Sequence, residues 1–223
     1  MKDIIKAGEG EVYDVELSVD LLKENEKIAE ENNALLKKNG VVAIDVMGSI
    51  GTGKTSLIEK LIGELKGKYR IAAFKGDLTT TIDAELIERH GVQTVAINTG
   101  KECHLDANLV RKALKQLDLH NLDLILIENV GNLICPAEFS LGSDKRIVVI
   151  SVTEGPYMVV KHPFIFFDAD VVVINKVDLA EAMEVDINKL EADVKKINPR
   201  AVVVATNCRS GKGVRSVVEA LKL

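Results

Sequence analysis

The sequence has no tryptophan and only three cysteines among its 223 residues, and it lacks long hydrophobic runs. No apolar stretch approaches the roughly 18 residues that a membrane span needs, so we expect no membrane partner. The formal net charge is −5 and no block of basic residues is present, which argues against nucleic acid as the main partner. Any phosphate binding must therefore be local.

The first nine residues contain acids and lysines and no apolar core of a secretory signal. We therefore expect a cytoplasmic location, where thiols stay reduced. In that compartment we expect the three cysteines to be free or metal-bound rather than paired in disulfides.

Seven short, β-branched runs predict strands at 41–47, 71–74, 95–97, 124–127, 147–151, 171–174 and 202–205. Because these runs are apolar on both faces apart from single polar residues, they predict a mostly parallel sheet with both faces covered by helices. Apolar residues with helical spacing, such as Leu57 and Leu61, lie between most of the runs. The alternation predicts a three-layer α/β domain of about seven strands over residues 41–223.

Residues 1–40 have a different pattern, which we interpret as an N-terminal extension packed on the core. Tyr13, Val15, Leu17 and Val19 alternate with polar residues, which predicts a strand-like segment. A polar helix should follow, with apolar pairs such as Ile28 and Ala29 repeating every seven residues. This stripe either packs on the chain's own sheet, which we favour, or faces a partner.

A phosphate-binding loop is predicted between the first strand and the first core helix. Its residues are Gly48, Ser49, Ile50, Gly51, Thr52, Gly53, Lys54, Thr55 and Ser56. The glycines let backbone N–H groups face the phosphates, and the helix adds its positive N-terminal end. Lys54 would reach the β- and γ-phosphates, and Thr55 would offer its hydroxyl to Mg²⁺. The alternative, a glycine-rich turn without a ligand, does not explain why the complete motif has this strand and helix context.

A guanine-recognition loop is predicted after the sixth strand, at Asn175-Lys176-Val177-Asp178. The Asp178 carboxylate can accept hydrogen bonds from N1–H and the 2-amino group of guanine, whereas adenine offers neither donor. Asn175 would support the loop and the other edge of the base, and the stem of Lys176 would cover the face of the base. The later run of Thr206, Asn207 and Cys208 is expected to touch the base as well. GTP is therefore the predicted nucleotide.

Two acids complete the predicted hydrolysis site together with Lys54. Asp77 follows the second strand and would hold Mg²⁺ or orient the attacking water. Glu128 ends the fourth strand and would contact the Mg²⁺ shell, while the amide of Gly131 would sense the γ-phosphate. Taken without the neighbouring motifs, each acid is equally well interpreted as a solvated loop residue.

A second candidate site consists of Cys103, His104 and Cys135. Two soft sulfur ligands and an imidazole suit Ni²⁺ or Zn²⁺ and would leave a fourth coordination position open. The spacing alone is weak evidence, because free cysteines are often simply buried.

The chain resembles the hydrogenase nickel-incorporation GTPases, the HypB family, in four segments: 48–55, 100–107, 128–136 and 175–178. The resemblance extends from about residue 20 to the C-terminus. It implies a GTP-hydrolysing metallochaperone that assists nickel insertion into [NiFe]-hydrogenase. It also implies a GTP-dependent homodimer with Cys103, His104 and Cys135 of both copies at the interface. Its implied partners are other hydrogenase-maturation proteins and the hydrogenase large subunit.

The resemblance also suggests that Lys161 of one copy reaches the nucleotide of the other. No arginine finger is evident, so the expected unaided turnover is on the order of 10⁻⁴ to 10⁻² per second. One departure is that no cysteine or histidine precedes His90, which argues against an N-terminal nickel-storage segment. Two alternatives remain at this stage: a metal carrier in which the nucleotide is only structural, and a small-molecule kinase.

Overall fold

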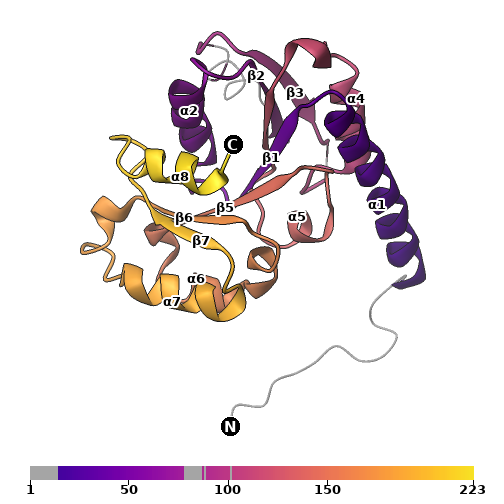
Figure 1. Cartoon of the computed structure of the whole chain (residues 1–223). Coiled ribbons are helices and arrows are strands. Elements are labelled where there is room, and N and C mark those ends of the chain that lie inside the picture. Colours follow the sequence, from indigo (N-terminus) through magenta and orange to yellow (C-terminus); the bar gives the residue numbers. More distant parts are fainter. Residues whose placement is uncertain (1–14, 78–86, 88, 101) are drawn as a thin grey trace.

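The computed structural model describes residues 15–77, 87, 89–100 and 102–223, and side chains at 15–19 and 77 lie outside the description. Within these residues one parallel sheet has the strand order β3-β2-β4-β1-β5-β6-β7 (Figure 1). The strands are β1 (Val42–Met47), β2 (Ile71–Asp77), β3 (Gln93–Asn98), β4 (Leu124–Glu128), β5 (Lys145–Ser151), β6 (Val171–Asn175) and β7 (Val202–Ala205). All seven predicted strands are present, and every pairing is parallel.

Helices cover both faces of the sheet, as its apolar strands require. They are α1 (Val15–Lys38), α2 (Lys54–Leu65), α4 (Ala107–Leu114), α5 (Cys135–Glu138), α6 (Met158–Lys161), α7 (Ile187–Ile197) and α8 (Val214–Leu221). Short 3₁₀ turns lie at Leu119–Asn121, Val152–Glu154, Pro163–Phe166 and Val177–Leu179. Helices α2 and α8 share one hydrophobic cluster on one face, and α4 and α7 lie in two clusters on the other. The predicted three-layer α/β architecture is confirmed.

Helix α1 packs against α4 and β1, so its apolar stripe belongs to the chain's own core. Leu36 and Ala29 are buried there, and two buried asparagines add polar contacts. Asn32 Nδ2 donates to the carbonyl oxygens of Ala107 and Leu141 at 2.8 and 3.2 Å. These bonds satisfy carbonyl groups that would otherwise be costly to bury.

The predicted strand-like segment is wrong from Val15 onward, because residues 15–19 begin helix α1. The alternation covers only a few residues, which is too short to separate a strand from the first turns of an amphipathic helix. Leucine, glutamate and lysine then continue the segment, and all three are good helix formers. Tyr13 and the residues before it lie outside the described part of the chain.

The parallel strands bring β1, β4 and β6 to one edge, where their carboxyl ends carry the predicted motifs. The end of β3 reaches this region across β2, because Gly76 of β2 has no side chain. A Cβ at Gly76 would lie 2.8 Å from Cγ of Leu105 and 3.0 Å from the carbonyl oxygen of Glu128. The loop that follows β3 therefore lies directly beside the end of β4.

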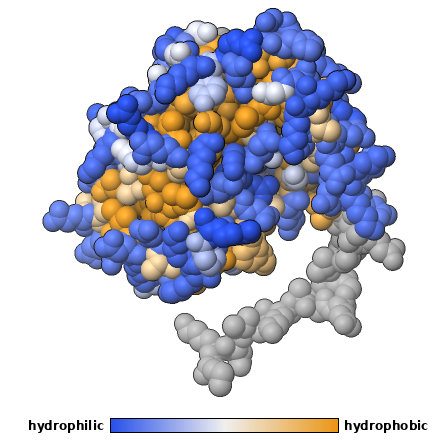
Figure 2. All heavy atoms as spheres, viewed as in Figure 1, coloured by the Kyte–Doolittle hydropathy of each residue, from blue (hydrophilic) through white to orange (hydrophobic). Residues whose placement is uncertain are grey.

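The molecular surface on the side shown in Figure 2 is mostly hydrophilic. Two hydrophobic areas interrupt it, one where Figure 1 places β1 and β2 and one where it places β6 and β7. In the described ranges, no helix combines the length and the apolar character that crossing a membrane requires.

Candidate nucleotide and metal site

The predicted phosphate loop connects β1 to α2 and borders a cavity of about 510 Å³. The loop residues that line this cavity are Ile50, Gly51, Gly53, Lys54, Thr55 and Ser56. Lys54 is only 6% exposed, and its Nζ donates to the carbonyl oxygens of Gly48 and Ser49, each at 3.0 Å. Ser49 donates its hydroxyl to Glu154, and Thr52 donates its hydroxyl to the carbonyl of Ser49 at 3.0 Å. The loop is thus held closed by its own polar groups.

The predicted guanine loop borders an adjoining cavity of about 350 Å³, which shares Gly53, Ser56 and Lys176 with the first. Asp178 is exposed and lines it together with Asn207 and Cys208. Lys176 has a left-handed backbone (φ 61°), and its Nζ donates to the carbonyl of Gly51 at 2.7 Å. The motifs at 48–56 and 175–178 therefore meet around one continuous hollow.

Asn175 joins three segments of the chain beneath this hollow. Its Nδ2 donates to the carbonyl of Thr52 at 2.8 Å. Its Oδ1 accepts from the Thr206 hydroxyl at 3.1 Å and from the amide of Cys208 at 3.0 Å. These bonds show that Asn175 supports the loop, and Asn175 also lines the cavity, while Thr206 is buried rather than part of the cavity wall.

Glu128 lies at the end of β4 and is only 1% exposed. Its Oε1 accepts from the Thr55 hydroxyl at 2.8 Å and forms an ion pair with Nζ of Lys75 from β2. Its Oε2 is buried and has no hydrogen-bond partner among the described residues. Lys75 belongs to no motif, so sequence reasoning did not include it in the site.

The groups around Thr55 and Glu128 fit a magnesium ion. Mg²⁺ prefers oxygen ligands, and a hydroxyl lies here beside a carboxylate whose second oxygen is unused. Thr55 and Glu128 would hold the ion, which would neutralise charge on the nucleotide phosphates. Asp77, the third predicted residue, ends β2, and its side chain lies outside the described part.

The predicted metal ligands come together from the loop after β3 and from the start of α5. The sulfur atoms of Cys103 and Cys135 lie 2.8 Å apart, and Nδ1 of His104 lies 3.9 Å from the Cys103 sulfur. One ligand atom from each residue lies within 4.8 Å of the others. All three side chains are half-buried, and the imidazole stacks on Phe139 with 3.9 Å between ring centroids. This donor set suits a soft divalent cation such as Ni²⁺ or Zn²⁺.

Burial controls the protonation of these ligands. It lowers the pKa of His104 below its ordinary value, against the opposing effect of Glu102, Asp106 and Glu138. The imidazole is therefore neutral at pH 7 and has a lone pair for a metal. Burial also raises the pKa of Cys135, and the hydrogen bond with Cys103 raises it further. Binding a cation through thiolates would therefore release protons.

Two asparagines that sequence reasoning missed hold the metal loops. Asn129 Oδ1 accepts from the amides of Leu105 at 3.2 Å and Val130 at 3.0 Å, and its Nδ2 donates to Asp45 at 3.2 Å. Asn132 Nδ2 donates to the carbonyl of Cys103 at 3.4 Å. Their only sequence signal is their place in the segment between Glu128 and Cys135.

That same segment also touches the phosphate loop. Residues Gly48 and Asn132 form an isolated β-bridge. At Gly131 a Cβ would lie 2.9 Å from the backbone nitrogen and 3.0 Å from the Cα of Ile50, so only glycine fits without displacing the loop. Residues 128–136 therefore contact the candidate nucleotide cavity at one end and the metal ligands at the other.

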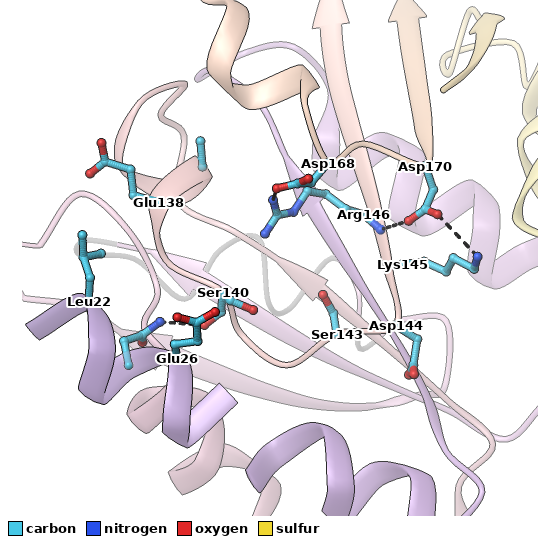
Figure 3. A pocket seen from close by; sticks show the side chains of 12 residues that line it. Leu22, Glu26, Glu138, Ser140, Ser143, Asp144, Lys145, Arg146, Asp168 and Asp170 are labelled. Carbon is cyan, nitrogen blue, oxygen red and sulfur yellow. Dashed lines mark hydrogen bonds and ion pairs between the residues drawn. The ribbon is translucent and has the colours of Figure 1, made fainter. Parts of the chain in front are cut away.

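Two other regions are separate from this site. Lys161 is exposed at the end of α6 and lines neither of the two adjoining cavities. A cavity of about 560 Å³ lies between α1, α5 and the start of β5 (Figure 3). Its basic groups are paired within it, Lys145 with Asp170 at 3.4 Å and Arg146 with Asp168 at 3.8 Å. The chemistry therefore favours the hollow at the phosphate loop as the functional site, although its volume is slightly smaller.

Comparisons with known proteins agree with this geometry. A family model described as "CobW/HypB/UreG, nucleotide-binding domain" matches residues 42–205. A probable hydrogenase maturation factor HypB of Methanocaldococcus jannaschii is 55% identical over 205 residues, which are 92% of this chain and 93% of that protein. HypB of Escherichia coli K12 is 36% identical over 90% of this chain and 69% of its own length.

Two crystal structures are also similar. HypB from Archaeoglobus fulgidus has a TM-score of 0.84 and 48% identity, and the match covers 90% of this chain and 98% of that one. HypB from Helicobacter pylori in complex with nickel has a TM-score of 0.84 and 32% identity, covering 89% and 94%. The chain belongs to the HypB family of hydrogenase maturation factors, within the CobW/HypB/UreG group of P-loop GTPases.

Proposed function

We propose that this protein is a slow GTPase that binds nickel, or zinc, at a site controlled by its nucleotide and assists nickel insertion into [NiFe]-hydrogenase. The observation that carries the proposal is the segment 128–136, which contacts both candidate sites. It begins at Glu128, next to Thr55, and ends at the ligand Cys135. The nickel complex of the Helicobacter pylori HypB supports nickel as the cargo.

The proposed coupling follows from these contacts. A γ-phosphate in the cavity would draw in Lys54 and the amide of Gly131, which lies against Ile50. Asn132 would transmit any shift of this segment to the backbone of Cys103, because it bonds to that carbonyl. Nucleotide binding would therefore change how the two thiols face one cation. Hydrolysis and phosphate release would reverse the change.

The exposed apolar residues near the sites favour the proposed GTP-dependent homodimer. Ile50 in the phosphate loop is 81% exposed, and Ile134 beside the metal ligand Cys135 is 60% exposed. A face-to-face dimer would cover both and bring the Cys103, His104 and Cys135 sets of two copies together. In that arrangement Lys161 is the candidate for reaching the partner's nucleotide. We also propose that the partners of this protein are other hydrogenase-maturation proteins and the hydrogenase large subunit, and that it acts in the cytoplasm.

The decisive experiment measures nickel and zinc affinity with GDP and with a non-hydrolysable GTP analogue, reading the monomer–dimer state in the same samples. Wild-type protein is compared with Cys103→Ala and with Gly131→Ala. We expect the nucleotide to change the wild-type metal affinity and, by linkage, the metal to change nucleotide affinity by the same factor. Gly131→Ala should weaken that coupling, because the new Cβ displaces the loops from each other, while nickel affinity without nucleotide should stay close to wild type.

If neither affinity nor assembly responds to the nucleotide, the sites are uncoupled and the protein is a metal carrier. If the Lys54→Ala variant delivers nickel as well as the wild type does, that result also favours the metal-carrier alternative. A phosphate-acceptor screen distinguishes the kinase alternative, which the exposed carboxylate of Asp178 in the base pocket does not favour. Asp178→Asn should shift preference from guanine toward xanthine, and unchanged GTP affinity in that variant contradicts the assignment.

A further inference from the structure

Lys75 is a buried lysine that no sequence motif marks. It lies on β2, its side chain is 7% exposed, and it lines the cavity of about 510 Å³ beside the phosphate loop. Lysine is rarely buried unless it is paired, because removing its charge from water is costly. Lys75 therefore needs a local partner, and the partner is informative.

The Lys75 ammonium contacts the two groups that fit magnesium. It forms an ion pair with Oε1 of Glu128, and Nζ lies 3.5 Å from the hydroxyl oxygen of Thr55. That hydroxyl donates to the same Glu128 oxygen at 2.8 Å. A positive charge thus already lies where a divalent cation would bind. Lys54, the other buried lysine of the cavity, is held differently, by carbonyl oxygens of the phosphate loop.

We propose that Lys75 is a built-in cation that competes with Mg²⁺ for Glu128 and Thr55 and so sets how tightly this protein holds magnesium and nucleotide. The proposal rests on the function proposed above. Lys75 already compensates the Glu128 charge, so an arriving cation gains less from that carboxylate. Two cations sharing one buried carboxylate also repel each other strongly, because the cavity wall screens them poorly. Lys75 must therefore leave Glu128, or accept that repulsion, whenever the metal–nucleotide complex forms.

Lys75 thereby adjusts nucleotide exchange as well as metal affinity. Without the metal, its ammonium keeps Glu128 paired, so the empty site is stabilised. With the metal bound, the displaced ammonium favours metal release, and GDP that has lost its metal dissociates more easily. Replacing Lys75 with a neutral side chain should remove both effects.

The test uses the full chain with GDP and Mn²⁺ as a spectroscopic probe for the Mg²⁺ position. Lys75→Met should raise the Mn²⁺ affinity of the GDP complex roughly tenfold and slow GDP release in Mg²⁺ by a similar factor. Lys75→Arg keeps the charge and should stay close to wild type. Lys145→Met is the matched control, since Lys145 is another strand lysine paired with an acid. It lies at the start of β5 and lines the separate cavity of about 560 Å³ rather than the one beside the phosphate loop.

Unchanged or weaker Mn²⁺ affinity in Lys75→Met, with normal GDP binding by the wild type, overturns this inference and leaves the proposed function intact. A wild type that binds no guanine nucleotide overturns both. If Lys75→Met does not fold, Lys75→Gln replaces it, because the amide can still donate to Glu128 without a charge. The same increase in Mn²⁺ affinity is then expected, and its absence is equally decisive.

Discussion

The nucleotide cavity and the Cys103, His104 and Cys135 cluster lie at the same edge of the sheet, yet they are built differently. The phosphate loop is one contiguous segment fixed between β1 and α2, and the side chains of Thr52 and Lys54 bond to carbonyl oxygens of that same segment. The proposed metal ligands come from the loop after β3 and from the start of α5, with Cys103 and Cys135 32 residues apart in the sequence. Their positions depend on side chains from elsewhere, chiefly Asn129 and Asn132.

From this difference we infer that the phosphate loop is the more rigid of the two sites and the metal cluster the more adjustable. The phosphate loop is bounded by a strand and a helix of the core, so a ligand finds it largely preformed. The segments that carry Cys103 and Cys135 are held through side-chain hydrogen bonds of Asn129 and Asn132, so small backbone movements would change the distance between them. A nucleotide-controlled metal site benefits from that asymmetry, since a small shift at a rigid loop alters the geometry of a softer one.

The largest predicted effect comes from a substitution in the phosphate loop, which should weaken the nucleotide site and leave the metal site unchanged. Lys54→Ala should lower GTP affinity about a thousandfold, because contacts of a charged donor with phosphate are worth about 1.5–3 kcal/mol each. Nickel affinity without nucleotide should stay unchanged. Titrations with a fluorescent GTP analogue and with nickel measure both. Lys60→Ala, on the exposed side of the same helix, is the control, and an equal loss in both variants would contradict the assignment.

The converse substitution removes a proposed ligand from the metal cluster. Cys135→Ala should lower nickel affinity about a hundredfold or more, since even the loss of an outer-shell partner costs about 10–100-fold. Competition with a chelator of known affinity measures it. Cys208→Ala is the matched control, because this buried thiol lies in the base loop away from the cluster. Equal effects of the two substitutions would rule out the proposed ligand set.

A substitution at Asp45 tests the buried carboxylate that accepts a hydrogen bond from Asn129 beneath the metal loops. Burial raises the pKa of Asp45 to about 6, although Arg146 and the hydrogen bond from Asn129 oppose this. The native protein therefore holds this proton more tightly than the unfolded chain does, so stability falls as pH rises from about 4 through 6. Asp45→Asn should stabilise the fold by roughly 2–3 kcal/mol at pH 7.5 and have little effect at pH 3.5.

Urea unfolding at both pH values measures this difference. Asp20→Asn is the control, because Asp20 is 78% exposed on α1 and should leave the pH profile unchanged. A pH-independent effect of Asp45→Asn would mean that ionisation of the Asp45 carboxylate is not what lowers the stability of the fold at pH 7.5.

The smallest predicted effect probes the connection between the frame and the metal loops. Asn129→Ala frees the amides of Leu105 and Val130 and should lower nickel affinity about tenfold, with GTP affinity changed less than about threefold. Asn121→Ala, at an exposed turn, is the control. Parallel losses of nickel and GTP affinity would show that Asn129 supports the whole fold rather than the metal loops.

Much of the fold and part of the site could be predicted from the sequence. The seven strands were found because both faces of the sheet are covered, which makes most residues of each strand apolar. The strand-like interpretation of residues 15–19 failed because a short alternation is ambiguous. Glu128 could be placed in the site from its position at a strand end. Its partner Lys75 could not, because one lysine inside a strand gives no local signal.

The sequence by itself predicted the phosphate loop and the guanine loop and determined the parallel sheet, because each depends on contiguous residues and their immediate strand or helix. Only the tertiary structure decided that Cys103 and His104 meet Cys135, that Lys75 pairs with Glu128, and that Asn129 links Asp45 to the loop after β3. These contacts join residues from different strands and loops. Their geometry depends on how β2, β4 and β1 lie side by side, which local patterns do not encode.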